Sequence, residues 1–339
     1  MKTALPSVDM PHYHKRHSGD VDEHATHISA WRQEYDQLSC GHFDGMVREL
    51  LLDGTRLQVF HEFTSQQTSQ RCQPWAGSVW FGIPDGIGAG ALHFSGRLQG
   101  EERQRVLLTA RAQEGFLLCT PRRFGIYGVV IDEQWLGARF GELGLRGPLP
   151  QASGVAAAEL PPHRHVALCQ TLESMLSLGA SGEASLPWAQ QALRLLGEQL
   201  VRLLGECGAD VAPAAGVSGS VQRRLAVVMA ARGLVADPCN HLQSVDELCQ
   251  RLHLTPRTLH NHFQSTVGES PSEFLRAVRL NACRRRLRGT ADRAVKVQDV
   301  AAQWGFFHMG RFSQEYKDLF GELPSQTLRQ ARAADPCWN

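Results

Sequence analysis

The sequence contains no run of about eighteen apolar residues, the length that a membrane-spanning helix requires. Its first residues, MKTALPSVDMP, lack the apolar core of a signal peptide. Nine cysteines are scattered along the 339 residues, and no two of them form a C-x-x-C pair. An odd and dispersed set argues against a disulfide framework or a structural zinc site and for a reducing compartment. We therefore expect a cytoplasmic protein that does not associate with membranes.

Signatures of common enzymes are absent as well. The chain has no G-x-S-x-G, P-loop or G-x-G-x-x-G pattern. The remaining enzyme hypothesis is a metal-dependent cupin, which needs histidines and a carboxylate on β-strands. Of the H-x-H pairs within the first two hundred residues, His12/His14 precede every expected strand and His163/His165 begin an expected helix. We expect neither catalysis nor a metal site, and stoichiometric iron or zinc in purified protein would revive the cupin alternative.

The net charge of +1 hides an uneven distribution of charge along the chain. Residues 221–332 contain 17 lysines and arginines against 10 aspartates and glutamates, a net charge of +7. The remaining residues carry a net charge of −6. A basic carboxyl-terminal third joined to an acidic remainder is typical of a polyanion-binding module fused to another domain. A merely solvated basic surface is the alternative.

One pattern occurs twice within this basic region. The apolar residues of 245–263 recur in 297–316 at an offset of 52 or 53 residues. A repeat of this kind is stronger evidence for the architecture of a region than the secondary-structure propensity of its residues. The matched pairs are Val245/Val297, Leu248/Val300, Leu252/Trp304, Leu254/Phe306, Leu259/Phe312, Phe263/Tyr316, Gly268/Gly321 and Pro271/Pro324. Each copy predicts a short amphipathic helix, a tight turn and a second helix, which together make a helix-turn-helix motif. A lone copy could equally be a helical hairpin with a solvated face.

The outward face of each second helix is polar, and arginine, asparagine and glutamine can pair with base edges in the major groove. The candidate residues are Arg257, Thr258, His260, Asn261 and Gln264 in the first copy and Arg311 and Gln314 in the second. Between the copies, a helix expected from Pro271 to about Arg288 carries arginines that cannot all face inward. We expect phosphate contacts, with plain solvation as the alternative, from among Arg276, Arg279, Arg284, Arg285 and Arg286.

The first two hundred residues predict a β-rich domain. Residues 1–22 are expected to be loosely ordered, and the spacing of Ile28, Trp31, Tyr35 and Leu38 predicts an amphipathic helix over 24–38. The hydrophobic period then changes to two, which predicts a small sandwich or barrel followed by a short helix over 133–140. The expected strands are 46–52, 57–64, 79–83, 91–94, 105–110, 116–119 and 126–131.

Two further helices, 163–178 and 187–204, are expected after a connector at 148–162. The leucines on one face of these helices could pack in the core of a single chain or form the interface of a homodimer. The fold class is thus α+β, with a ligand-sensing and dimerisation domain at 1–204 and a flexible linker at 205–220. An all-α DNA-binding domain follows at 221–332, with helix-turn-helix motifs at 244–265 and 297–317.

The stretch WGFFHMGRFSQEYKDLFGELPS from Trp304 resembles the signature of the AraC/XylS family of transcription regulators. The resemblance implies seven helices, with two helix-turn-helix motifs bridged by a long helix and entering successive major grooves. It places base-facing roles on Arg257, His260 and Asn261 in the first copy, and on Met309, Gly310, Arg311 and Gln314 in the second. A glycine has no side chain to read bases and a methionine makes only apolar contacts. The second copy is therefore expected to read few bases.

Residues 20–38 and 78–84 are similar to the ethanolamine-operon regulators of that family. This resemblance implies an activator of a catabolic operon that responds to ethanolamine and adenosylcobalamin and contacts RNA polymerase. It maps no ligand-contact residue, and another small-molecule inducer is the alternative. Residues 22–27 begin like the cobalt-ligating D-x-H-x-x-G box, but His27 stands where glycine is required, and a helix cap by Asp22 is the favoured explanation. A purely architectural DNA binder would need no folded acidic partner domain.

Overall fold

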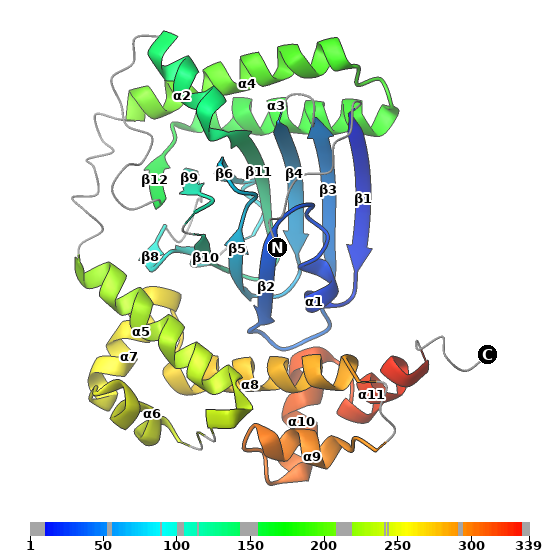
Figure 1. Ribbon diagram of the computed structural model, residues 1–339, viewed down its shortest axis with the longest axis vertical. Coiled ribbons are helices and arrows are strands. Elements are labelled where there is room, and N and C mark those ends of the chain that lie inside the picture. The colour runs from blue at the N-terminus through cyan, green and yellow to red at the C-terminus, as the bar shows by residue number, and fades with distance from the viewer. Residues whose placement is uncertain are drawn as a thin grey trace.

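The computed structural model describes residues 11–52, 56–88, 90–99, 105–113, 115–142, 155–207, 219–240, 242, 244–290 and 294–333. A β-sandwich lies between a helical layer, α2 to α4, and a region formed by α5 to α11 (Figure 1). The predicted α+β class, with a β-rich amino-terminal part and a helical carboxyl-terminal part, is confirmed.

The sandwich consists of two antiparallel sheets. The seven-stranded sheet has the order β1-β3-β4-β11-β6-β9-β12, and the five-stranded sheet has the order β2-β5-β10-β7-β8. The strands of the larger sheet are β1 (His12–Ser18), β3 (Gly45–Leu52), β4 (Leu57–Thr64), β6 (Ser78–Pro84), β9 (Val106–Arg111), β11 (Phe124–Asp132) and β12 (Val155–Glu159). Those of the smaller sheet are β2 (Arg32–Gln37), β5 (Thr68–Gln73), β7 (His93–Phe94), β8 (Arg97–Leu98) and β10 (Phe116–Thr120).

Aromatic side chains fill the space between the two sheets. Trp80 stacks on Phe116 with ring centroids 4.2 Å apart, and Trp31 meets Phe60 edge to face at 5.5 Å. Such pairs add to the free energy gained by burying their large apolar surface. Gly128 is required by this packing, since a Cβ there would lie 2.0 Å from the Phe60 ring.

The opposite face of the larger sheet is covered by helices α2 (Glu133–Glu142), α3 (Pro162–Ser181) and α4 (Leu186–Cys207) (Figure 1). The predicted leucine stripe of α4 belongs to this core, because Leu193, Leu196 and Leu200 are buried against the sheet and α3. Within the described ranges, no helix is long and apolar enough to cross a membrane.

The amphipathic helix predicted over 24–38 is wrong. Helix α1 (Val21–His24) ends early, Ala30 adopts a left-handed φ of 61°, and β2 begins at Arg32. Tyr35 points into the sandwich and is buried, whereas Glu34 and Asp36 on the opposite face of β2 meet arginines of the carboxyl-terminal helices. The apolar spacing that matched a helix is therefore satisfied by a turn and a strand, and tertiary contacts decide the conformation.

The amino-terminal segment also differs from expectation. Residues 12–18 were expected to be loose, but they form β1 and pair with β3 along its whole length, from His12 opposite Leu51 to Ser18 opposite Gly45. His12 and His14 therefore lie on a strand, and residues 1–10 fall outside the described ranges. Strand β12 lies within the predicted connector, and β5 was missed because its buried residues are mostly polar. Thr68 of β5 is satisfied there by Thr120, at 2.8 Å between the hydroxyl oxygens.

The other predicted strands and helices are confirmed, with bounds shifted by a few residues. The carboxyl-terminal region contains α5 (Gly219–Ala236), a 3-10 turn (Pro238–Asn240), α6 (Val245–Leu252), α7 (Pro256–Val267), α8 (Pro271–Arg288), α9 (Val297–Gln303), α10 (Met309–Phe320) and α11 (Pro324–Ala333). Helix α8 runs beneath the sandwich and joins the α6–α7 pair to the α9–α10 pair (Figure 1).

The sandwich and the carboxyl-terminal helices share one core. Leu117 and Cys119, on the outer face of β10, belong to the same buried cluster as Val228 of α5 and Phe263 of α7. Asn281 of α8 extends the edge of the smaller sheet, because its side-chain amide accepts from the Gln37 nitrogen at 3.1 Å and donates to the Gln37 carbonyl at 2.9 Å. The two regions are thus docked closely in this structure.

Candidate DNA-binding surface

The two sequence copies fold as equivalent helix-turn-helix motifs. In the first, the turn between α6 and α7 is closed by a hydrogen bond from the Leu254 nitrogen to the Cys249 carbonyl, at 2.9 Å. In the second, the Phe306 nitrogen donates to the Ala301 carbonyl at 3.0 Å. The inward residues predicted for the second helices are buried, namely Leu259, Phe263, Phe312 and Tyr316.

The helices that would enter the grooves begin differently. Helix α7 has proline in its first turn, and the Thr255 side chain accepts a hydrogen bond from the Thr258 nitrogen at 3.2 Å. Helix α10 begins after His308, which makes no capping hydrogen bond through its side chain. A threonine cap satisfies one of the backbone N–H groups that a helix start leaves without an intrahelical partner.

This difference predicts that alanine substitutions at the residues preceding α7 and α10 have unequal effects on the free energy of unfolding. Replacing Thr255 by alanine is expected to lower the free energy of unfolding by about 1 kcal/mol, because the cap is lost. Replacing His308, at the equivalent position of α10, should change it by less than about 0.5 kcal/mol. Urea unfolding of the two variants measures both values, and equal losses would contradict the assigned role of Thr255.

Helix α7 presents a continuous polar face to solvent. Arg257, His260, Asn261 and Gln264 are exposed, and Thr258 is half-buried through its contact with Thr255. All five predicted side chains of the first copy therefore belong to one helix whose opposite face is in the core. This is the arrangement needed by a helix that lies in a major groove.

The corresponding face of α10 carries fewer groups able to read bases. Arg311 and Gln314 are exposed, but each donates a hydrogen bond to a carboxylate in the next turn of α10. Arg311 Nε lies 2.7 Å from Glu315, and the Gln314 side-chain nitrogen lies 2.7 Å from Asp318. The Arg311 side chain is 67% exposed, so its ion pair is weak and can exchange for another partner. Gly310 is exposed, and Met309 is half-buried against the core of the second motif.

Three of the five arginines proposed for phosphate contact lie outside the interface with the sandwich. Arg286 is exposed. Arg276 is also exposed and lies 3.4 Å from Glu315, and Arg279 donates to the Leu242 carbonyl at 2.9 Å. Burial and the nearby Arg276 lower the pKa of Arg279 below its ordinary value.

The other two arginines are held by carboxylates of the sandwich. Arg284 pairs with Asp20 and, at 3.0 Å, with Glu322 of its own region. Arg285 lies 2.6 Å from Asp22 and 2.8 Å from Asp36. Burial opposes the charge of Arg285, but these two carboxylates outweigh it and raise the pKa of the guanidinium.

Two more arginines complete this interface. Arg232 of α5 lies 2.6 Å from Asp36 and also pairs with Glu34, and Arg288 pairs with Asp20. We call the set the charge clamp; its carboxylates are Asp20, Asp22, Glu34 and Asp36, and its guanidiniums are Arg232, Arg284, Arg285 and Arg288. The charge clamp is not predicted by the sequence motifs, although the opposite net charges of the two regions were the signal that could have suggested it.

The sandwich also touches both motifs at equivalent points. Gly268 and Gly321 end α7 and α10 in the left-handed conformation, with φ of 78° and 76°. A Cβ added at Gly268 would lie 2.7 Å from the ring of His93, and one added at Gly321 would lie 3.3 Å from the His42 backbone. The backbones of both helix ends thus pack closely against loops and strands of the sandwich.

Four of the histidines considered for metal or cobalt make polar contacts within the fold. His24 is buried, with Nε2 2.9 Å from a carboxylate oxygen of Glu62, and His14 lies 3.1 Å from Glu49. The nearby His27 is also buried, and its carbonyl oxygen lies 3.2 Å from His14 Nε2. His165, in the first turn of α3, has Nε2 2.7 Å from the Pro84 carbonyl oxygen. No group of three histidine, cysteine or acidic side chains is arranged to hold a metal ion in the part of the chain that the structure describes.

The comparison with protein families matches the carboxyl-terminal region. Residues 248–330 match the family model described as a helix-turn-helix domain. The chain is 35% identical over 89 residues to the XylDLEGF operon transcriptional activator of Pseudomonas putida, covering 26% of this chain and 28% of that protein. It is 34% identical over 86 residues to the probable thc operon regulatory protein of Rhodococcus erythropolis, covering 25% and 26%. The chain thus spans less than a third of these relatives' length.

Two solved structures align over more of the chain at low similarity. The AraC-like transcriptional activator CuxR aligns with 12% identity and a TM-score of 0.34, over 70% of this chain and 80% of that one. ToxT from Vibrio cholerae aligns with 11% identity and a TM-score of 0.27, over 89% and 98%. The sequence match over 248–330 therefore carries the assignment: this part of the chain is a helix-turn-helix domain similar to those of the AraC/XylS-type transcription regulators.

Proposed function

We propose that the chain is a DNA-binding transcription regulator, and specifically an activator. One observation carries the proposal: two equivalent helix-turn-helix motifs present polar helix faces and are joined by the rigid helix α8. In the proposed complex, α7 and α10 enter successive major grooves about 10 bp apart. The similar proteins include transcriptional activators, which supports the direction of regulation.

A small-molecule inducer belongs to this proposal. The ligand favours one of two interdomain or dimer arrangements, and the arrangement determines whether both recognition helices engage DNA and whether RNA polymerase is contacted. Ethanolamine with adenosylcobalamin, acting on an ethanolamine-utilisation operon, is the inducer implied by the resemblance of residues 20–38 and 78–84. A different small molecule is the alternative.

The charge clamp supports the existence of two arrangements. In the docked form, Arg284 and Arg285 are paired with carboxylates and are not available to phosphate. Release of the sandwich would expose these guanidiniums on the helix that joins the motifs. We therefore assign phosphate contact to Arg276, Arg279 and Arg286 in either arrangement, and to Arg284 and Arg285 after release.

Competition binding tests the proposal. Labelled fragments from upstream of the neighbouring operons are titrated with full-length protein, in the presence and absence of ethanolamine and adenosylcobalamin. At least one fragment is expected to bind at least 10³-fold more tightly than random duplex of equal length. Equal affinity for all fragments would refute a sequence-specific regulator and would favour an architectural binder.

Arg286 provides a separate test of the phosphate role. Replacing it by alanine should weaken binding to every duplex to a similar degree and reduce the slope of log affinity against log salt by about 1, because one phosphate contact is lost. Arg56, on the sandwich and 67% exposed in side chain, is the matched control, and its replacement should leave the slope unchanged. An unchanged slope for Arg286→Ala would remove this residue from the phosphate-binding set.

A further inference from the structure

The turn of the second motif contains one residue more than the turn of the first. In the first motif, Leu254 is followed directly by Thr255, the residue that caps α7. In the second, Phe307 stands between Phe306 and His308, the residue that precedes α10. This extra residue accounts for the change in offset between the two copies from 52 to 53 residues. The side chain of Phe307 therefore has no counterpart in the first motif.

The turn holds Phe307 outside the core. Its neighbour Phe306 points inward and packs on Phe312, with ring centroids 5.1 Å apart. Trp304 fixes the same turn to the end of α5, because its indole nitrogen donates to the Ala236 carbonyl at 3.1 Å. A residue just before a helix cap often packs on the fourth helical residue, here Phe312, but Phe306 already makes that contact. Phe307 is 64% exposed, the largest fraction among the bulky apolar residues that the structure describes.

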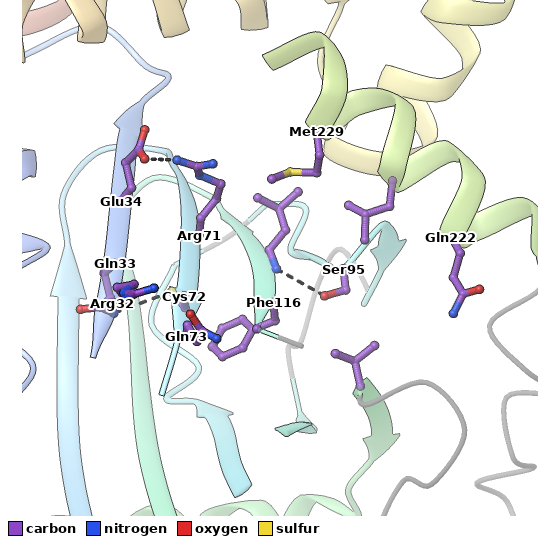
Figure 2. A pocket seen from close by; sticks show the side chains of 14 residues that line it. Arg32, Gln33, Glu34, Arg71, Cys72, Gln73, Ser95, Phe116, Gln222 and Met229 are labelled. Atoms are coloured by element: carbon purple, nitrogen blue, oxygen red, sulfur yellow. Dashed lines mark hydrogen bonds and ion pairs between the residues drawn. The ribbon is translucent and has the colours of Figure 1, made fainter. Parts of the chain in front are cut away.

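Docking of the sandwich does not explain this exposed ring. Two half-buried apolar residues of α5, Leu225 and Met229, line a cavity of about 530 Å³ together with Phe116 of β10 (Figure 2). Contact between the two regions thus accounts for the apolar side chains on that surface. Phe307 is held in solvent by a turn whose own apolar residues are in the core of the second motif.

Phe307 lies at the end of α10 that would enter the major groove. The N-terminal residues of a recognition helix contact base edges, and α10 begins at Met309, two residues after Phe307. Gly310 is exposed, and a Cβ built there would meet no atom of the described residues within 4 Å, so DNA can approach this end of the helix closely. Arg276 of α8 is exposed beside the same helix, 3.4 Å from Glu315, and can supply positive charge for a flanking phosphate.

The polar side chains of α10 are less ready to read bases than this ring. Arg311 and Gln314 each donate to a carboxylate in the next turn, and these bonds compete with pairing to a base edge. A phenyl ring has no such competing bond. Thymine presents a methyl group in the major groove, and phenylalanine is one of the side chains that make apolar contact with it.

We propose that Phe307 reads thymine in the half-site of the second motif, by packing its ring against the C5-methyl group of the base. The inference rests on the proposed function, because it requires α10 to lie in a major groove. It adds a specificity-determining residue that lies outside the recognition helix itself. The second motif then selects its half-site through an apolar contact as well as through Arg311 and Gln314.

The test replaces thymine by deoxyuridine, which lacks only the methyl group, in the promoter fragment that the full-length protein binds best. Each thymine in the two protected segments is replaced singly, and affinity is measured by fluorescence anisotropy. At one position or more the affinity should fall about fourfold, as expected for the loss of one buried methyl group. In Phe307→Ala, affinity for the unmodified fragment should fall by at least as much, and the same replacement should then have no further effect.

Leu195→Ala is the matched control. It removes an apolar side chain that is 59% exposed on α4, and it should leave both the affinity and the sensitivity to deoxyuridine unchanged. The proposal is overturned if no thymine is sensitive, or if every sensitive position stays equally sensitive in Phe307→Ala. Unchanged DNA binding with reduced transcription in vitro would also overturn it, by placing Phe307 against RNA polymerase.

These results separate the inference from the proposed function. A preferred fragment with two protected segments, but without a deoxyuridine effect that depends on Phe307, would refute the inference and leave the regulator intact. The absence of any preferred fragment would refute both.

Discussion

Replacing Asp36 by alanine is expected to lower the free energy of unfolding by about 3–5 kcal/mol, the range measured when one partner of a buried ion pair is removed. The Asp36 side chain is fully buried and lies 2.6 Å from Arg232 and 2.8 Å from Arg285. Its removal leaves the almost fully buried guanidinium of Arg232 with Glu34 as its remaining carboxylate partner. Desolvation of a charge is costly when its partner is removed, which is why the expected loss is large.

Urea unfolding of the full chain, followed by circular dichroism, measures this loss. The control is Arg56→Ala, which breaks a 2.8 Å pair with Asp132 at the surface and should cost less than about 1 kcal/mol. If Asp36→Ala were no more destabilising than this control, the charge clamp would not hold the two regions together in solution.

Replacing Arg257 by alanine is expected to reduce discrimination between the operator and single-base variants of it by about 1–3 kcal/mol at one position of the first half-site. The side chain is exposed in the first turn of α7, where a helix lying in the major groove places its base contacts. The loss should be specific to that base pair, because Arg257 is proposed to read a base and not a phosphate.

Fluorescence anisotropy with the operator and with each single-base variant measures this discrimination. Arg251→Ala removes an equal charge from α6, where Arg251 donates to the Asn240 carbonyl at 2.9 Å, and should leave the discrimination unchanged. If Arg257→Ala left the footprint and the affinity profile as they are in the unsubstituted protein, α7 would not be the recognition helix of the first motif.

The carboxyl-terminal motifs could be predicted because the same pattern of apolar residues occurs twice in the sequence. Residues such as Leu259 and Phe312 occupy matching places in a short-range pattern, and both are buried as that pattern requires. The left-handed glycines that end α7 and α10 and the prolines that begin α8 and α11 are local signals of the same kind. Local signals survive in the structure when tertiary contacts agree with them.

The charge clamp could not be derived from such signals. Glu34 and Asp36 lie on one face of β2, but the apolar spacing around them matched a helix, on which they would not share a face. Their partners lie about 200 residues or more further along the chain, at Arg232 and Arg285. A single sequence gives no indication of which distant charges meet, so it offers only phosphate contact or plain solvation for the arginines of α8.

The charge clamp and both motifs depend on how the sandwich is docked. The clamp joins the sandwich to α5 and α8, and the ends of both recognition helices pack against the sandwich. An inducer that changes this docking would therefore act on contacts that reach both motifs. Coupling of this kind requires only that the ligand prefers one of the two arrangements.

Hydroxyl-radical footprinting of the protein on the promoter fragment that it binds best tests the central claim directly. Two protected segments about 10 bp apart on one face of the duplex are expected, one for each motif. The assignment of the two motifs to DNA would be contradicted if footprints were equally weak on random duplex and on every promoter fragment and lacked this spacing, with and without ethanolamine and adenosylcobalamin.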